Sequence, residues 1–391
     1  MLTNDLLSRE EREAVIDMRH AMHREPELSN QEAKTQKRII ETLRRFGLDG
    51  AKTFHNTGVY IDIEGLAPGP KRAIALRGDI DALPIQEDRD DLPYRSQVSG
   101  LMHACGHDMH ASIALGTALA FHRMRHSFSG KVRVIFQPAE EAEPLGGRTV
   151  AEGGLLVGFD AAVGFHVDTH IPAGSFGARA GAVTKSSEQF EINIIGTMAH
   201  GAESYAGVDA ITIAAAFINE VQKVVSREMP VDDGAIITIG TIHGGEATNI
   251  ICPSVVMTGT IRTSSPERRN LLVQRVREVA EGVAAMHRGS VEFSARSGEP
   301  AVVNDVSMVE RFRQIVIRSA GEDKYVHVKP SSGSDDFGFY SGCVPSIYFQ
   351  FGSREPGNEM GVHTPTFGAS DKILIPTTEL AIQYCWELLH D

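Results

Sequence analysis

The stretch from Met102 to His110 constrains the fold most, because it places a thiol, three imidazoles and a carboxylate within nine residues. Cysteine, histidine and acidic side chains are the ligands that Zn²⁺ and other first-row divalent metals take in proteins. Only Gly106 separates Cys105 from His107, so both side chains can converge on one point. The apolar run Ala111 to His122 predicts a buried helix directly afterwards. The cluster is therefore expected in a loop that opens a helix, where backbone N–H groups favour thiolate and carboxylate.

Two other interpretations of this cluster stay open: a structural zinc knuckle, and polar residues that bind no metal. A structural zinc site takes four protein ligands, often with a second cysteine pair. The other cysteines, Cys252, Cys343 and Cys385, form no Cys-x-x-Cys spacing. Any remaining ligands must then come from elsewhere in the chain.

Short apolar runs alternate with amphipathic helices, which predicts an α/β fold: an open, mostly parallel sheet with helices on both faces. The strand-like runs are 59–64, 73–77, 131–137, 161–166 and 346–351. In such a sheet the carboxyl ends of the parallel strands share one edge, where ligands bind. Six residues that follow these runs or open the helix are expected to meet there: Cys105, His107, Glu140, Glu141, His166 and His363.

Two pairs of carboxylates stand just after predicted strands. Glu140 and Glu141 follow Pro138, where the backbone leaves the sheet, so one can reach a metal while the other faces a water molecule. Asp79 and Asp81 lie two residues apart and face the same way in extended backbone. For each of the two aspartates alone, turn and cap chemistry is an equally good interpretation.

In residues 185–301 the order of predicted helices and strands changes. This segment is expected to form a second domain, inserted into a catalytic domain of residues 1–184 and 302–391. The order strand–helix–strand–strand–helix–strand matches the ferredoxin-like α+β pattern. The predicted strands are 189–195, 235–242, 255–261 and 290–295, and the predicted helices are 207–225 and 266–286. Candidates in this domain for contacting a substrate are His200, Asn249 and Arg262, with surface or turn polarity as the alternative.

The charge and the cysteines limit the classes of partner and the cell compartment. The net charge is −13 and the pI is near 5.7, and a net acidic protein is attracted neither to nucleic acid nor to an anionic membrane. No apolar run approaches the about 20 residues of a membrane span, and the N-terminus shows no signal-peptide pattern. Four scattered cysteines make no disulfide framework, so a cytoplasmic protein is expected.

A pair of close divalent metals activates water at neutral pH and polarises a carbonyl group. A carboxylate that binds no metal can take the proton of that water and pass it to a leaving amine. Glu140 and Glu141 supply one such base and one ligand, and Cys105 then acts as a ligand rather than as a nucleophile. A mixed set of sulfur, nitrogen and oxygen donors suits Mn²⁺ or Zn²⁺, and also Co²⁺ or Ni²⁺.

Six motifs, spread from the first quarter of the chain to its end, resemble those of the M20 metallopeptidase family. They are Asp79-Ile-Asp-Ala-Leu-Pro, Met102-His-Ala-Cys-Gly-His-Asp, Phe136-Gln-Pro-Ala-Glu-Glu, Gly164-Phe-His-Val, Gly333-Ser-Asp-Asp-Phe and His363-Thr-Pro. They are similar to the aminoacylase-like amidohydrolase branch, which includes hippurate hydrolases and indole-3-acetyl-amino-acid hydrolases. This resemblance implies a di-metal catalytic domain with a smaller lid and dimerisation domain, in a homodimer or a higher homo-oligomer.

Matching the motifs residue by residue implies roles for the candidates. Glu140 would be the general base, and His200 would be the lid histidine that reaches a substrate site, either in its own subunit or across the dimer. The implied metal ligands are Cys105, His107, Glu141, His166 and His363. The substrate side departs from the family, because this chain has His200-Gly-Ala-Glu-Ser-Tyr205 where the family reads His-Ala-Ala-x-Pro-His. Tyr205 thus replaces a second imidazole, and Glu203 adds negative charge.

The sequence therefore predicts a metal-dependent amidohydrolase that cleaves the amide bond of an N-acyl amino acid or a related small amide. The alternative within the same architecture is a metallo-dipeptidase or aminopeptidase that acts on small free peptides. A hydrolase that uses Cys105 as its nucleophile, and a metal-binding protein without turnover, stay open as well.

Overall fold

The computed structural model of the chain describes residues 6–230, 234–356 and 360–390. It divides into two compact units, each with its own hydrophobic core. The first unit consists of Met1–Val183, Val303–Lys329 and Asp336–Asp391, and the inserted unit of Thr184–Val302 and Pro330–Asp335. Within the described ranges, no helix combines the length and the apolar character that crossing a membrane requires.

The first unit is built on an eight-stranded sheet with strand order β1-β2-β4-β3-β5-β14-β6-β13. The four neighbours β4, β3, β5 and β14 run parallel to one another, so the predicted mostly parallel sheet is confirmed. The strands are β1 (Lys52–Phe54), β2 (Gly58–Glu64), β3 (Ala73–Asp79), β4 (Lys131–Gln137), β5 (Ala161–Pro172), β6 (Phe176–Ala178), β13 (Tyr325–His327) and β14 (Ser346–Arg354). A short pair of β7 (Gly181–Ala182) and β12 (Val303–Asn304) lies beside them.

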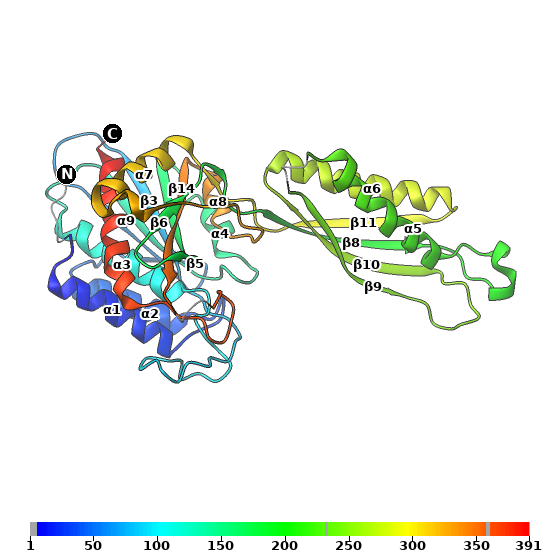
Figure 1. The fold of residues 1–391 in the computed structure, drawn as a ribbon, viewed down its shortest axis with the longest axis horizontal. Helices are drawn as coiled ribbons and strands as arrows, with labels where there is room; N and C mark the ends of the chain where they lie inside the picture. The colour runs from blue at the N-terminus through cyan, green and yellow to red at the C-terminus, as the bar shows by residue number, and fades with distance from the viewer. Residues whose placement is uncertain (1–5, 231–233, 357–359, 391) are drawn as a thin grey trace. The chain divides into compact units, whose positions relative to one another are not determined.

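Helices cover both faces of this sheet (Figure 1). On one face, α3 packs so close to β3 that a Cβ on Gly78 would lie 2.5 Å from the carbonyl oxygen of His110. On the other face, a Cβ on Gly164 of β5 would lie 2.8 Å from the ring of Phe337, just before α8. The helices of the unit are α1 (Arg9–Arg24), α2 (Ala33–Arg45), α3 (His107–Arg123), α4 (Gly146–Glu152), α7 (Val306–Ala320), α8 (Gly338–Ser341) and α9 (Leu374–Leu389).

Helix α3 begins four residues earlier than the apolar run predicted. It starts at His107 rather than at Ala111, and Gly106 before it has φ +84°. Glycine adopts this left-handed conformation without steric strain. A Cβ there would also lie 2.7 Å from Val167, so the sharp turn into the helix requires a glycine on two counts. The last residues of the Met102–His110 cluster therefore occupy the first turn of α3.

The inserted unit has the predicted βαββαβ order, and its antiparallel sheet has strand order β11-β8-β10-β9. The elements are β8 (Ser186–Ile195), α5 (Ala210–Lys223), β9 (Ile236–Gly244), β10 (Ser254–Thr263), α6 (Pro266–Met286) and β11 (Ser290–Ser297). Figure 1 shows α5 and α6 along one face of this sheet, where they enclose the second core. The ferredoxin-like prediction is confirmed for this unit.

Candidate metal centre

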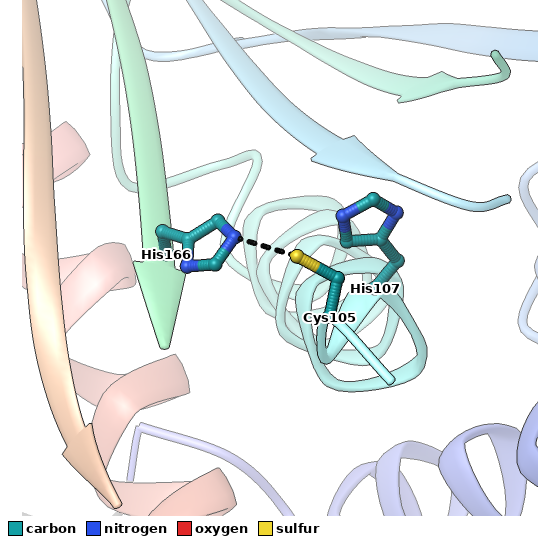
Figure 2. Close-up of side chains that lie close together, drawn as sticks. All are labelled: Cys105, His107 and His166. Carbon is teal, nitrogen blue, oxygen red and sulfur yellow. Dashed lines mark hydrogen bonds between the residues drawn. The ribbon is translucent and has the colours of Figure 1, made fainter. Parts of the chain in front are cut away.

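The loop that opens α3, the first residue of α3 and the middle of β5 bring three of the predicted ligands together (Figure 2). The sequence predicts that this strand ends at His166, whereas β5 continues to Pro172. The Sγ atom of Cys105 lies 3.3 Å from Nε2 of His166. His107 follows Cys105 across the Gly106 turn, and its ring nitrogen belongs to the same group of ligand atoms, all within 4.8 Å of one another. The parallel strands end at the edge of the sheet where α3 begins, so this is the edge at which α/β sheets bind ligands.

Two further predicted ligands reach the same thiol from the loops after β4 and β14. Nε2 of His363 lies 3.2 Å from Sγ of Cys105 and 3.1 Å from Oε1 of Glu141. Cys105, Glu141 and His363 form a second group of ligand atoms within 4.8 Å, and His107, Glu140 and Glu141 form a third. The fold thus assembles all six residues expected at this edge.

The chemistry of these side chains fits divalent metals. Nε2 of His107 is buried without a hydrogen-bond partner among the described residues. It lies 3.7 Å from Oδ2 of Asp79 and 4.0 Å from Oε1 of Glu141. Buried polar atoms are rarely left unpaired, and an imidazole nitrogen that faces carboxylates and a thiol is a fitting metal ligand.

The charges around Cys105 favour its thiolate, which is the form of cysteine that binds metals. Burial opposes ionisation of Cys105, but the imidazoles of His166 and His107 outweigh burial and lower the pKa of the thiol well below its ordinary value. Burial, and then the charge on Cys105, raise the pKa of Glu141. Negative charge concentrated on one sulfur and its neighbours favours a cation between them.

Asp81 orients both His107 and Glu141. Its Oδ1 lies 3.1 Å from Nδ1 of His107, and its Oδ2 accepts the backbone N–H of Glu141 at 3.0 Å. When Nδ1 donates to the carboxylate, Nε2 is the nitrogen left to face a metal. Asp81 therefore sets the tautomer of one predicted ligand and the backbone position of another.

Asp79 and His110 join α3 to β5. Nδ1 of His110 lies 2.7 Å from Oδ1 of Asp79, and Nε2 of His110 accepts the N–H of Val167 at 3.0 Å. Burial lowers the pKa of His110 to about 4, so the ring is neutral. Because both ring nitrogens are engaged, His110 is not a free ligand, and it instead fixes the backbone next to His166.

Two loops of the centre contain non-glycine residues with left-handed backbone. Ala139 has φ +50° and His363 has φ +61°. This conformation costs about 1–2 kcal/mol for a residue with a Cβ, and such strain persists only where the surrounding contacts impose it. Ala139 immediately precedes Glu140 and Glu141, so the strained turn determines where both carboxylates point.

Sequence reasoning missed the part of the N-terminal segment that supports Asp81 and the turn at Ala139. Ser29 donates its hydroxyl to Oδ2 of Asp81 at 2.7 Å, and Glu32 accepts the backbone N–H of Ala139 at 2.8 Å. The short polar stretch between the first two helices, without a preceding strand, gave no signal of either contact.

The inserted unit holds the three substrate candidates in two separate places. His200 and Asn249 lie side by side, because Gly201 N–H donates to the carbonyl of Asn249 at 2.7 Å. Arg262 lies near the far end of β10, where Nη1 is 3.3 Å from Oγ of Ser334. Strand β10 starts at Ser254, and at about 3.3 Å per residue its eight steps to Arg262 span roughly 26 Å. One copy of this unit therefore does not bring Arg262 to the other two residues.

Comparisons with known proteins found similar sequences over most of the chain. The model of the peptidase family M20/M25/M40 matches residues 75–385. A protein of Sinorhizobium fredii named as an uncharacterised hydrolase is 70% identical over 389 residues, which cover 100% of this chain and 97% of that protein. The N-acetyl-L-cysteine deacetylase of Bacillus subtilis is 36% identical over 375 residues, covering 96% of this chain and 88% of that protein.

A solved structure matches nearly the whole chain as well. It is the Bacillus subtilis YXEP protein, described as a dinuclear metal binding peptidase from the M20 family. The two chains are 32% identical, with a TM-score of 0.84 and coverage of 98% of this chain and 99% of that one.

Proposed function

The chain belongs to peptidase family M20/M25/M40, and on that premise we propose that it hydrolyses the amide bond of N-acyl amino acids. It is a metal-dependent amidohydrolase. The observation that carries the finer proposal is the meeting of Cys105, His107, Glu141, His166 and His363 with one further carboxylate, Glu140, at the same sheet edge. The deacetylase relative supports an acylated amino acid as the substrate.

Two divalent cations, Mn²⁺ or Zn²⁺, are proposed to bind this donor set, and Co²⁺ or Ni²⁺ would also suit it. Cys105 belongs to one group with His107 and His166 and to another with Glu141 and His363. Because Cys105 belongs to both groups, its thiolate would be one of the side chains that hold the cations. When bound, such ions act as Lewis acids that polarise the amide carbonyl and make water acidic enough to ionise at neutral pH.

Glu140 is proposed as the general base. Its carboxylate belongs to the group formed with His107 and Glu141, while its side chain is only half-buried. A carboxylate placed there accepts the proton of the attacking water and then passes it to the nitrogen of the leaving amine. The products are a carboxylate and a free amino acid.

His200 is proposed to donate a hydrogen bond to the substrate. Its Nδ1 accepts the N–H of Ala202 at 3.2 Å, so the proton of a neutral ring resides on Nε2, and the side chain is exposed. Donors of this kind stabilise the oxyanion that develops in amide hydrolysis.

A homodimer is proposed because Arg262 is distant from the other two candidates within one inserted unit. His200 and Asn249 of one copy and Arg262 of another would then serve one small substrate. Tyr205, which is 78% exposed near His200, supplies apolar area for such an interface.

The test is a panel of N-acetyl amino acids and the matching free dipeptides, assayed with Mn²⁺ and with Zn²⁺. We expect hydrolysis of the acylated compounds only, and Glu140→Gln should lower kcat by about 10²–10⁴-fold while leaving metal content unchanged. Equal hydrolysis by protein held in chelator would contradict the proposal. Preference for the free dipeptides would indicate a dipeptidase, and chelator-resistant activity lost on thiol alkylation would indicate a Cys105 nucleophile.

A further inference from the structure

We infer that Glu32 is a positioning residue for Glu140 and Glu141, which it holds in place through the backbone of Ala139. The consequence for catalysis rests on the proposed function of Glu140 and Glu141, whereas the positioning itself rests on the contacts of Glu32 alone.

Both oxygens of the Glu32 carboxylate are engaged away from its own helix. Oε1 accepts the backbone N–H of Ala139 at 2.8 Å, and Oε2 accepts the hydroxyl of Thr57 at 2.6 Å. The side chain is 0% exposed. Glu32 stands at the N-cap of α2 but makes no capping bond with its side chain. A buried carboxylate that does not cap its own helix is expected to accept hydrogen bonds from another part of the structure.

The capping of α2 is instead performed by Glu27. Its Oε2 accepts the N–H of Thr35 at 2.8 Å, and its Oε1 accepts the N–H of Lys34 at 3.1 Å. Two glutamates five positions apart therefore make different contacts. Glu27 caps α2, and Glu32 bonds to the turn that precedes Glu140 and Glu141.

Ala139 is the residue at which a small change of backbone would redirect Glu140 and Glu141. It is 0% exposed, it has φ +50°, and its carbonyl accepts the N–H of Gly146 at 3.0 Å. Both of its backbone polar groups are thus held, the amide by a charged acceptor. Hydrogen bonds to ionised acceptors are stronger than those between neutral groups, which is what a strained turn requires in order to persist.

The same N-terminal stretch supports the turn at a second point. Ser29 donates to Oδ2 of Asp81, and that same oxygen accepts the N–H of Glu141. The Ser29–Glu32 stretch therefore holds the backbone on both sides of Glu140, directly at Ala139 and through Asp81 at Glu141.

The experiment compares Glu32→Gln with the matched control Glu27→Gln in the full-length, metal-loaded protein. The glutamine amide keeps an oxygen for the N–H of Ala139 and can donate its N–H₂ group to the hydroxyl of Thr57. The acceptor of Ala139 N–H is then neutral and its hydrogen bond weaker, so the Ala139 turn should loosen. We expect faster amide hydrogen exchange in peptides covering 137–145, and kcat lower by at least about 10-fold with KM within about 2-fold. The control should show wild-type exchange in these peptides and wild-type kcat.

Thr57→Val leaves the bond between Glu32 and Ala139 in place. It should therefore raise amide exchange in these peptides less than Glu32→Gln does, and it provides a milder variant if Glu32→Gln does not fold.

Wild-type exchange at 137–145 in both Glu32→Gln and Thr57→Val would overturn the positioning. Faster exchange with wild-type kcat would overturn its catalytic consequence. Failure of the proposed function has a different signature, because Glu140→Gln would then keep its kcat whatever the exchange at Ala139.

Discussion

The Sγ atom of Cys105 lies 3.2 Å from Nε2 of His363, although 258 residues separate them in the chain. The thiol comes from the loop that opens α3 and the imidazole from the loop after β14, so neither segment can hold this contact alone. The sulfur also lies 3.3 Å from His166, which makes Cys105 the common neighbour of the predicted ligands.

Replacing Cys105 by serine should therefore disrupt the metal centre. A serine hydroxyl is not ionised at neutral pH and is a poor substitute for a thiolate ligand. We expect Cys105→Ser to retain fewer metal ions per chain after desalting, as measured by plasma emission, and to lose its hydrolytic activity. Cys343→Ser, at an exposed thiol, is the control that should keep its metals. A Cys105→Ser protein with wild-type metal content would show that the sulfur is not a ligand.

Asp81→Asn should weaken metal binding without removing any ligand. The asparagine N–H₂ group would face either His107 Nδ1 or the two donors that now share Oδ2, the Ser29 hydroxyl and the Glu141 amide. Loss of such a supporting carboxylate typically lowers metal affinity by about 10–100-fold, which competition with a chelator measures. Asp62→Asn removes a carboxylate that pairs with Arg133 on the sheet. The same weakening in that variant would mean that the effect is general destabilisation.

Capping chemistry explains why the start of α6 could be predicted. Ser265 accepts the N–H of Arg268 at 3.2 Å, and Pro266 occupies the first helical position. Both signals are local and can be read from adjacent residues. The start of α3 was missed for the opposite reason, because apolar periodicity begins at Ala111 while the helix begins where Gly106 turns the chain.

The convergence of the six site residues could be expected, because each follows a predicted strand or opens a helix and parallel strands end at a common edge. The contribution of Ser29 and Glu32 could not. Their hydrogen bonds reach across 52 and 107 residues, and no periodic pattern connects a polar turn with a partner so distant. The supporting residues depend on tertiary packing, whereas the candidate ligands carry a chemical signature of their own.

Gly78→Ala should destabilise the first unit. The added Cβ would lie 2.5 Å from the carbonyl oxygen of His110 and 2.9 Å from Cβ of Ala114, so β3 and α3 would have to separate. Overpacking of this kind typically costs about 1–3 kcal/mol, which would appear as a lower midpoint in calorimetry. Gly240→Ala, in a strand of the inserted unit where the nearest atom is 3.9 Å from the added Cβ, should leave the midpoint close to wild type. Equal midpoints for Gly78→Ala and wild type would contradict the close packing of α3 on β3.

A buried histidine between two carboxylates makes stability depend on pH. Nδ1 of His23 lies 2.9 Å from Oδ2 of Asp108, and Nε2 lies 3.0 Å from Oε1 of Glu87. Burial disfavours the imidazolium, but the two carboxylates outweigh burial and raise the pKa of His23 from 6.5 to about 9. The folded protein therefore holds this proton more tightly than the unfolded chain does.

A group whose pKa is raised on folding contributes stability in full below its unfolded pKa and loses it as the pH rises through the folded pKa. For His23 that interval runs from 6.5 to about 9. Across it, the free energy of unfolding of the wild type should fall relative to His23→Gln by on the order of 3 kcal/mol, as measured by urea unfolding in chelator. Glu87→Gln removes one of the two carboxylates that raise the folded pKa of His23, so its decline should start at the same pH, end at a lower pH and be smaller. A difference between wild type and His23→Gln that stays constant across the interval would mean that His23 is neutral in the folded protein, and the two carboxylates would then have to be balanced by Arg19, which lies 3.4 Å from Asp108.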